Sequence, residues 1–461
     1  MTATNTIAPR AFAVWWKEFD RWSVSYFQSG RWYWPPSILK RVADFTKPEA
    51  LSITVSEAQK QNIPIISKIN FSGELFLRNS DDYSDYKGRL FLVKPNRFIF
   101  SKINAKRGCI YFAQEHQKPF AVSSEYPVLT LDTNTVLGDY FNLAMRVGPA
   151  RECLVGFAAG MAKARTNLED FQNIEIPLPS LTEQQAIVAR WRKAQDEIAA
   201  IRERVENRKV AIDARFFADL GLRSPDQLSM QKAFAVVWGD FLRWGVRFNQ
   251  LSQVGADITK GTFPGVELDR LLKVVQYGTS EKANSNGDGV PILRISNIKE
   301  RAIDFSELKH ILLPKKTIEG LLLQDGDVLI IRTSGSRDLV GTCAVFRGQG
   351  NFVFASYLIR LRFDTERVLP EFVSWFLNSP LGRQQVDAVS RQIMQNNINS
   401  EELRGLQIPI PPIAVQKQIM ERVAAGREEI ARERETADRL AGDINAEVEG
   451  LILGTKTLRE G

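Results

Sequence analysis

The chain has 461 residues, of which 44% are hydrophobic and 25% charged, and its formal net charge is +7. This length is too great for one ordinary core and suits two to four domains of a folded soluble protein. No stretch approaches the ~18 uncharged apolar residues of a membrane-spanning helix, so the composition argues against a membrane protein.

The N-terminus and the cysteines indicate a cellular compartment. The segment MTATNTIAPR has no basic patch followed by an apolar core, so we expect no secretory signal. Cys109, Cys153 and Cys343 are far apart and odd in number, which fits neither a disulfide framework nor a metal-ligand spacing. We therefore expect a cytoplasmic protein with reduced thiols.

The first predicted element is an aromatic helix that occurs twice. Residues 11–24 read AFAVWWKEFDRWSV and residues 233–246 read AFAVVWGDFLRWGV, with nine of fourteen positions identical. Steps of three and four between the aromatic residues predict helices over 11–27 and 233–249. Such a face suits a packed core better than a surface that stacks bases.

The first aromatic helix and the residues after it predict a mixed α/β domain over 1–175. Short β-rich runs alternate there with Gly, Pro and Asn turns. From Tyr86 to Gln114 the chain has seven Lys or Arg and no Asp or Glu, a number equal to the whole net charge. This basic island suits phosphate contacts, although a solvated loop edge would have the same composition.

A long helix is predicted over 176–220. Its opening, IPLPSLTEQQAIV, places Thr182 and Gln185 after Pro179, which resembles an N-cap with a capping box. Apolar residues then alternate by three and four, as in a coiled-coil seam, at Trp191, Ala194, Ile198, Ile201, Val205, Ile212 and Phe216.

The second half repeats this organisation. A second mixed α/β domain is predicted over 221–407, and a second long helix over 408–461 opens with IPIPPIAVQKQIM. Its seam is interrupted by Arg427 and Arg434 and otherwise consists of Met420, Val423, Ile430, Ala437, Ala441, Ile444, Val448 and Leu451.

Each long helix would span roughly 50–60 Å at ~1.5 Å per residue and could not bury its apolar stripe alone. We expect the two helices to pair antiparallel and to hold the two domains apart. The sequence thus predicts an α+β fold with a pseudo-twofold internal repeat.

This organisation resembles the DNA-specificity (S) subunit of type I restriction–modification systems, the HsdS family, over nearly the whole chain. The most specific parts are the two segments that open the long helices. In addition, YGTSEKANSNGDGVPILRISNI (277–298), GDVLIIRTSGS (326–336) and NNINSEELRGLQIPIPP (396–412) look like parts of a target-recognition domain of that family.

The resemblance implies two target-recognition domains, each reading one half of a split DNA site, with the long helices setting the gap. The first domain has no close copy of the YGTS segment, which implies two unlike half-sites. The resemblance also implies that the chain binds double-stranded DNA, docks two methyltransferase subunits that bind S-adenosylmethionine, and recruits restriction–translocase subunits. The chain itself would have neither catalysis nor a cofactor.

The residues agree with a chain that is not an enzyme. The sequence has no GxxxxGK[ST], HExxH, CxxC or NPPY-type motif, and His116 and His310 lie far apart in polar loops. Carboxylates form no spaced metal-binding constellation, and Asp325 and Asp327 around Gly326 are interpreted as a turn.

A DNA reader needs cations that hold phosphates and amide or guanidinium groups that read base edges. Loops of the first domain offer Lys102, Asn104, Lys106, Arg107, Lys163 and Arg165. Loops of the second domain offer Thr279, Ser280, Lys282, Asn284, Arg332, Ser334, Ser336, Arg337, Arg391, Gln392, Gln395, Asn396 and Asn397. Asn167 and Asn399 precede the two Pro pairs at the same distance and are interpreted as helix caps or turns.

Two other functions remain open. A coiled-coil scaffold could use the basic loops to dock an acidic protein without reading DNA. A self-contained DNA-modifying enzyme would have to bind S-adenosylmethionine by itself. Competition by duplex DNA tests the first alternative, and equilibrium dialysis with the cofactor tests the second.

Overall fold

The computed structural model describes residues 38–78, 86, 88–157, 165–222, 258, 261–389, 391–393 and 395–458. The chain forms two compact units, Met1–Ile201 with Glu435–Gly461 and Arg202–Arg434. Both units mix helices and strands, as predicted. The predicted aromatic helices over 11–27 and 233–249 lie outside the described residues.

The first unit is built on a four-stranded antiparallel sheet in the order β2-β10-β7-β8. These strands are Thr46–Glu49, Val128–Leu131, Arg97–Phe100 and Ile110–Ala113. Phe98 and Phe100 of β7 pack against Phe141 and Phe171, which come from α4 (Gly138–Ala144) and α6 (Leu168–Gln172). Aromatic burial of this size makes the sheet and the two helices one core.

Smaller elements complete the first unit. They are β1 (Leu39–Arg41), α2 (Val42–Phe45), β3 (Ser52–Ile53), α3 (Val55–Lys60), β4 (Ile66–Ile69), β5 (Leu75–Leu77), β6 (Leu90–Val93), η4 (Ala105–Arg107), β9 (Phe120–Ser123), α5 (Gly148–Phe157) and β11 (Glu175–Pro177). Strand β11 pairs with β1, and β3, β6 and β9 form a second sheet.

The second unit has a four-stranded antiparallel sheet of the same connectivity, β13-β22-β18-β20. Its strands are Leu272–Tyr277, Leu358–Phe363, Val328–Ile331 and Cys343–Val345. All four residues of β18 (VLII) are buried, as expected for an apolar strand covered on both faces.

The other elements of the second unit are β12 (Gly265–Glu267), η7 (Leu268–Leu271), β14 (Val290–Leu293), η8 (Ile295–Asn297), β15 (Ile298–Lys299), β16 (Ala302–Ile303), β17 (Lys309–Ile311), α9 (Lys315–Leu321), β19 (Thr333–Ser334), η9 (Arg337–Leu339), β21 (Val353–Phe354), α10 (Pro370–Asn378), α11 (Pro380–Val389), β23 (Arg391–Ile393), β24 (Gln395–Asn397), α12 (Ser400–Arg404) and β25 (Gln407–Pro409). Strand β25 pairs with β12, as β11 pairs with β1 in the first unit.

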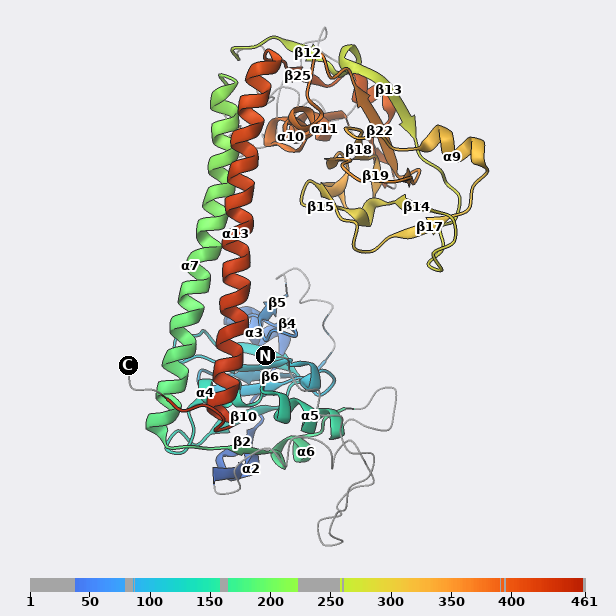
Figure 1. Ribbon diagram of the computed structural model, residues 1–461. Helices are drawn as coiled ribbons and strands as arrows, with labels where there is room; N and C mark the ends of the chain where they lie inside the picture. Colours follow the sequence, from blue (N-terminus) through green and yellow to red (C-terminus); the bar gives the residue numbers. More distant parts are fainter. Residues whose placement is uncertain are drawn as a thin grey trace. The chain divides into compact units, whose positions relative to one another are not determined.

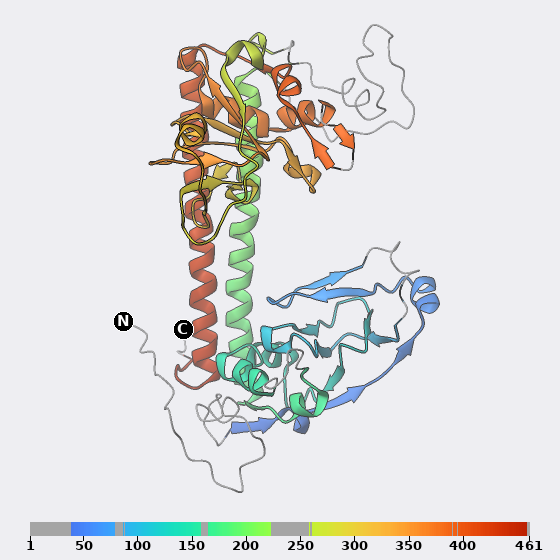
Figure 2. The ribbon, with the colours of Figure 1, turned by 90° about the vertical axis from the view of Figure 1, so that its right-hand side faces the viewer.

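The two predicted long helices are α7 (Leu181–Asp219) and α13 (Ile413–Ile452). Within each unit their segments lie side by side, as Figures 1 and 2 show. In the second unit Arg208 pairs with Glu433 at 3.4 Å and with Glu429, while the backbone of Gly426 packs on Ile212. Residues later in α7 thus contact residues earlier in α13, which confirms the antiparallel pairing.

The predicted seams are largely the buried faces of these helices. Ile198, Ile201, Val205 and Phe216 of α7 are buried. So are the α13 residues Val423, Ile430, Ala437, Ile444 and Val448. The predicted capping box was wrong by two residues, because Ser180 caps α7 and exchanges hydrogen bonds with Glu183. Thr182 already lies inside the helix.

Local features of the repeat also agree with the sequence. Asn167 and Asn399 cap α6 and α12, and their side chains accept from the backbone N–H groups of Asp170 and Glu402. Gly108 and Gly341, which end the two basic loops, have φ angles of 93° and 82° that favour glycine. None of the helices in the described ranges is long and apolar enough to cross a lipid bilayer.

Candidate nucleic-acid interface

Lys102 and Arg332 occupy the same structural position in the two units. Lys102 follows β7, its N–H donates to Glu125 O and its carbonyl accepts from Thr166 N. Arg332 follows β18, and its N–H and carbonyl make the same bonds with Tyr357 and Ile398. Glu125 and Thr166 each lie 232 residues before these partners. The internal repeat therefore places one predicted DNA-contacting cation at the same strand end twice.

In the first unit the candidate cations meet at one turn. The Lys102 Nζ donates to Ser124 O at 2.8 Å, and the Arg165 guanidinium lies 3.2 Å from the Glu125 carboxylate. Lys102 and Arg165 are 63 residues apart in the sequence, so the fold joins two loops that were predicted separately.

The short helix η4 carries the other candidates of the first unit. Asn104 precedes it, and Lys106 and Arg107 form its last turn. The Arg107 guanidinium lies 5.3 Å from the centroid of the exposed Phe71 ring, close enough for a cation–π contact. Lys163 lies outside the described residues.

The basic island is less free than its composition suggested. Arg97 makes a bidentate ion pair with Glu49, at 2.9 Å for both hydrogen bonds. This pairing lowers the pKa of the Glu49 carboxyl, chiefly through the hydrogen bonds from Arg97. Arg97 thus serves the sheet, whereas Arg107 and Lys94 stay exposed.

In the second unit a small sheet joins two predicted loops. Strand β19 pairs with β24, with Thr333 opposite Asn397 and Ser334 opposite Asn396, and β24 pairs with β23. The loop after Arg332 and the segment 391–397 are therefore neighbours. The side chains of Arg337, Arg391, Gln392, Gln395 and Asn396 lie outside what the structure describes.

Tyr277 brings a third segment to the same place. The Arg332 guanidinium lies 4.8 Å from the centroid of the Tyr277 ring. The Tyr277 hydroxyl accepts from Ser400 N at 2.9 Å and lies 3.2 Å from Ser400 Oγ, which fixes the ring against α12. Tyr277 is 36% exposed. The partly exposed aromatic ring thus lies against the guanidinium of the half-buried Arg332.

Two polar atoms of this site are buried without a hydrogen-bond partner among the described residues. They are Arg332 Nε and Asn397 Oδ1, from facing strand ends. Buried polar atoms are normally satisfied by protein, water or ligand. Among the described residues this donor and this acceptor are thus unsatisfied, close to the exposed Tyr357.

The loop after Tyr277 contains four candidates with different surroundings. Thr279 bonds through its backbone to Phe354 and Ser356, and its hydroxyl accepts from Glu281 N. The Asn284 amide closes a turn with Asp288 O and Asn286 N. Ser280 and Lys282 are exposed. In the neighbouring loop Ser334 Oγ accepts from the N–H of the exposed Ser336.

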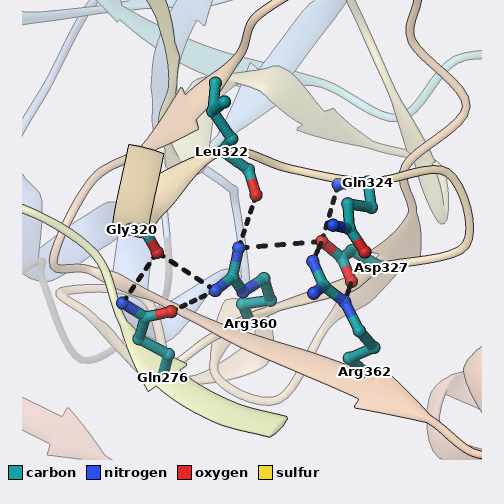
Figure 3. A network of polar contacts seen from close by, with 7 residues as sticks. All are labelled: Gln276, Gly320, Leu322, Gln324, Asp327, Arg360 and Arg362. Carbon is teal, nitrogen blue, oxygen red and sulfur yellow. Dashed lines mark hydrogen bonds and ion pairs between the residues drawn. The ribbon is translucent and has the colours of Figure 1, made fainter. Parts of the chain in front are cut away.

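The buried carboxylate of Asp327 belongs to a structural network, shown in Figure 3. Both oxygens accept from Arg362 at 2.7 Å, and Oδ2 also accepts from Gln324 N at 2.8 Å. Arg360 donates to Leu322 O at 2.6 Å and to Gln276. Asp327 does sit in the predicted turn, but it is also the anion that satisfies two arginines of β22.

The pKa values of the two arginines in this network shift in the expected directions. Hydrogen bonding to Asp327 raises the pKa of Arg362, and burial lowers the pKa of Arg360. Asp327 is fully buried and pairs with these arginines, so its carboxylate stabilises the sheet. Within the described ranges no group of three or more His, Cys, Asp or Glu side chains could hold a metal ion.

Sequence reasoning missed Tyr277, Tyr357 and Glu125. Tyr277 ends a strand directly before the Gly278-Thr279 turn, where added bulk at Gly278 would strike Phe354 O at 2.2 Å. An aromatic residue beside such a restricted turn was the available signal. No local pattern links Glu125 to Arg165 or Tyr357 to Arg332.

Comparison with known proteins shows which family has this architecture. The family model "Type I restriction modification DNA specificity domain" matches residues 34–208 and 266–437. The chain is 30% identical over 164 residues to the type I restriction enzyme EcoKI specificity subunit of Escherichia coli K12, covering 35% of each. It is 26% identical over 257 residues to the StySPI specificity subunit of Salmonella potsdam, covering 55% of this chain and 50% of that one.

These matches span only about a third to a half of the length of the relatives. A solved structure described as "Structural basis underlying complex assembly and conformational transition of the type I R-M system" has a TM-score of 0.53 at 15% identity. It covers 91% of this chain and 98% of that chain, which shows a common fold. Because the family model matches more than half of the sequence in two segments, the chain belongs to the type I restriction–modification DNA specificity family and contains its domain twice.

Proposed function

We propose that this chain is the sequence-specific DNA-binding subunit of a type I restriction–modification complex. It reads a split target, one half-site with each unit, and has no catalytic activity or cofactor of its own. The observation that carries this proposal is the repeated placement of Lys102 and Arg332 at equivalent strand ends. Two equivalent cation positions on one chain suit two DNA segments.

The two half-sites are unlike because the two contact regions differ. Lys102 is a point charge whose Nζ donates to Ser124 O, and a lysine ammonium suits a phosphate contact. Arg332 is a planar fork held by an aromatic ring, which suits bidentate contact with a guanine edge. The candidate loops around 102–107 and 165 serve one half-site. The loops around 279–284, 332–337 and 391–397 serve the other.

The domain boundaries follow the repeat. Residues 1–175 and 221–407 form the two target-recognition domains, and 176–220 and 408–461 form the two spacer regions. The 39-residue α7 and the 40-residue α13 set the gap between the half-sites. Two methyltransferase subunits, which bind S-adenosylmethionine, dock on the chain, and restriction–translocase subunits join the assembly.

Single-molecule sequencing of genomic DNA tests this proposal. Cells would carry the methyltransferase subunit with the wild-type chain, with an Arg332→Gln variant, or without the chain. We expect methylated adenines in a motif of two unlike halves around a fixed gap, only in cells with the chain. The Arg332→Gln variant should relax one half of the motif and leave the other unchanged.

A negative result would also be informative. If an active methyltransferase produced no motif that depends on this chain, the protein-docking scaffold would become the better explanation. Binding of S-adenosylmethionine by the purified chain alone, measured by equilibrium dialysis, would instead favour a self-contained enzyme.

A further inference from the structure

The turn between β15 and β16 has an unfavourable backbone. The pairs Ile298–Ile303 and Lys299–Ala302 leave only Glu300 and Arg301 in the loop. Their φ angles are 47° and 64°, both in the left-handed region. A two-residue hairpin of this kind favours Asn-Gly, because other side chains are strained there. The sequence keeps two long charged residues instead, so their side chains are expected to have a use.

Both side chains contact the long helices within the second unit. Glu300 accepts a hydrogen bond from Arg434 of α13 at 2.5 Å, and Arg301 lies 3.5 Å from Asp213 of α7. The Arg301 guanidinium also lies 5.0 Å from the ring centroid of Trp375 in α10. A cavity of about 390 Å³ remains between the turn and the helices. The turn is thus bonded to both helices without being packed solidly against them.

These contacts also explain the two arginines that interrupt the predicted seam. Arg427 and Arg434 alternate with the buried Val423 and Ile430 of α13, where a coiled coil prefers apolar residues. Arg434 pairs with Glu300, and Arg427 lies 6.0 Å from the Trp375 ring. The contacts around the Glu300–Arg301 turn therefore account both for its charged residues and for the two arginines in the seam.

The turn lies between two cores on opposite faces of the central sheet, since β18 contributes Leu329 and Ile331 to the outer core and Val328 and Ile330 to the inner core. Ile298 packs in the outer core with Ile292 and Phe354. The helix segments pack in the inner core with Phe372 and Trp375. The outer core supports the loop that contains the candidates Thr279–Asn284, since Ala283 packs against it. A tilt of the outer core on the helices would therefore move these candidate contacts.

We propose that the Glu300–Arg301 turn is a strut that fixes the orientation of the outer core of the second unit on the long helices. It thereby fixes the gap between half-sites that the protein accepts. This inference rests on the proposed function. Glu300, Arg301, Asp213 and Arg434 are positioning residues in this view, and none of them needs to touch DNA.

The decisive variant is Glu300→Asn combined with Arg301→Gly. It gives the hairpin its preferred turn residues and removes both ion pairs, and the thermal unfolding midpoint is measured beside binding to check that the variant is folded. Binding would be measured by competition between duplexes with the correct gap and with one base pair more or fewer. Two ion pairs of ordinary strength, one exposed and one half-buried, correspond to a loss of about threefold to tenfold in this gap discrimination. The preference for each half-site sequence should stay unchanged.

A charge exchange and a matched control complete the design. Glu300→Arg or Arg434→Glu alone should lower gap discrimination, and the two together should restore most of it. Arg432→Gln is the control, because Arg432 lies on the same helix and pairs within it, with Glu428 at 3.0 Å. This control should keep the wild-type gap preference.

The possible outcomes distinguish a failure of the strut proposal from a failure of the proposed DNA-reading function. Unchanged gap discrimination in the Asn-Gly variant would overturn the strut while leaving the DNA-reading function intact. A wild-type chain in its methyltransferase complex that ignored gap length, or bound no split target, would overturn both. A fall in gap discrimination together with changed base preference would also reject the strut, because the turn would then act on base contacts.

Discussion

Gln184 and Gln416, which lie 232 residues apart, make the same three hydrogen bonds in the two units. The Gln184 Oε1 accepts from Leu137 N at 2.9 Å, and its Nε2 donates to Thr135 O and Pro179 O. Gln416 does the same with Leu369 N, Arg367 O and Pro411 O. Both side chains are fully buried. Each amide joins the first turn of a long helix to the start of the helix that follows the central sheet.

Replacing Gln416 by Met should loosen this joint. The variant leaves the Leu369 N–H and two carbonyls unpaired in the interior, which costs about 1–3 kcal/mol. We expect faster amide hydrogen exchange at Leu369 and in the first turn of α10. Gln418→Met, at an exposed position of the same helix, is the control. Equal exchange in both variants would show that the amide is dispensable.

The ring of Tyr277 should matter more than its hydroxyl for the second half-site. Tyr277→Leu removes the cation–π partner of Arg332, and such contacts contribute about 0.5–2 kcal/mol. We therefore expect about a two- to thirtyfold loss of affinity for the second half-site, measured with competitor duplexes. Tyr277→Phe keeps the ring and loses only the bonds to Ser400, so its loss should be smaller. If the Leu variant bound the second half-site like the wild type, Arg332 would not be part of the reading site.

Lys102 and Arg332 should differ in the kind of binding they contribute, despite their equivalent positions. Lys102→Gln should lower affinity for all sequences alike and reduce the slope of log K against log salt by about one. Arg332→Gln should cost about 1–3 kcal/mol at one base pair and relax the preference there. Titrations at several salt concentrations distinguish these results. A sequence-dependent loss with Lys102→Gln would mean that this lysine reads a base.

Acid should weaken the first unit through the Glu49–Arg97 pair. In the folded state, hydrogen bonds from Arg97 hold the pKa of the Glu49 carboxyl below its ordinary value of 4.5. An acid with a lowered pKa stabilises the fold above its unfolded pKa, and this stabilisation is lost as the pH falls through the folded pKa. Glu49→Gln should therefore flatten the loss of stability below about pH 4.5. An acid unfolding curve as steep as that of the wild type would contradict this role.

The features predicted from the sequence were the periodic and local ones. Helix seams, the Asn167 and Asn399 caps and the repeated strand–loop–Gly pattern depend on residues close together in the chain. Even so, the capping box predicted at Thr182 was wrong, and the helix start at Leu181 identifies Ser180 as the cap.

The candidate site depended on pairings between distant residues. Tyr277, Arg332 and Asn397 meet because β19 pairs with β24 and α12 holds the Tyr277 hydroxyl. No spacing in the sequence encodes that pairing. The same holds for Arg427 and Arg434, which looked like defects of a coiled coil until the turn at Glu300 supplied their surroundings.

Asp327 should be essential for stability and unnecessary for chemistry. Asp327→Asn keeps the shape but leaves Arg362 and the 5% exposed Arg360 without their anion, and breaking a buried pair costs about 3–5 kcal/mol. We expect early thermal unfolding and rapid amide exchange in β18 and β22. Asp325→Asn, which removes only an exposed partner of Arg347, should cost less than about 1 kcal/mol. Because each unit has its own core, binding to the first half-site should survive in the Asp327 variant at low temperature. If that variant kept its stability and lost only methylation of the target, the network would have to act on function directly.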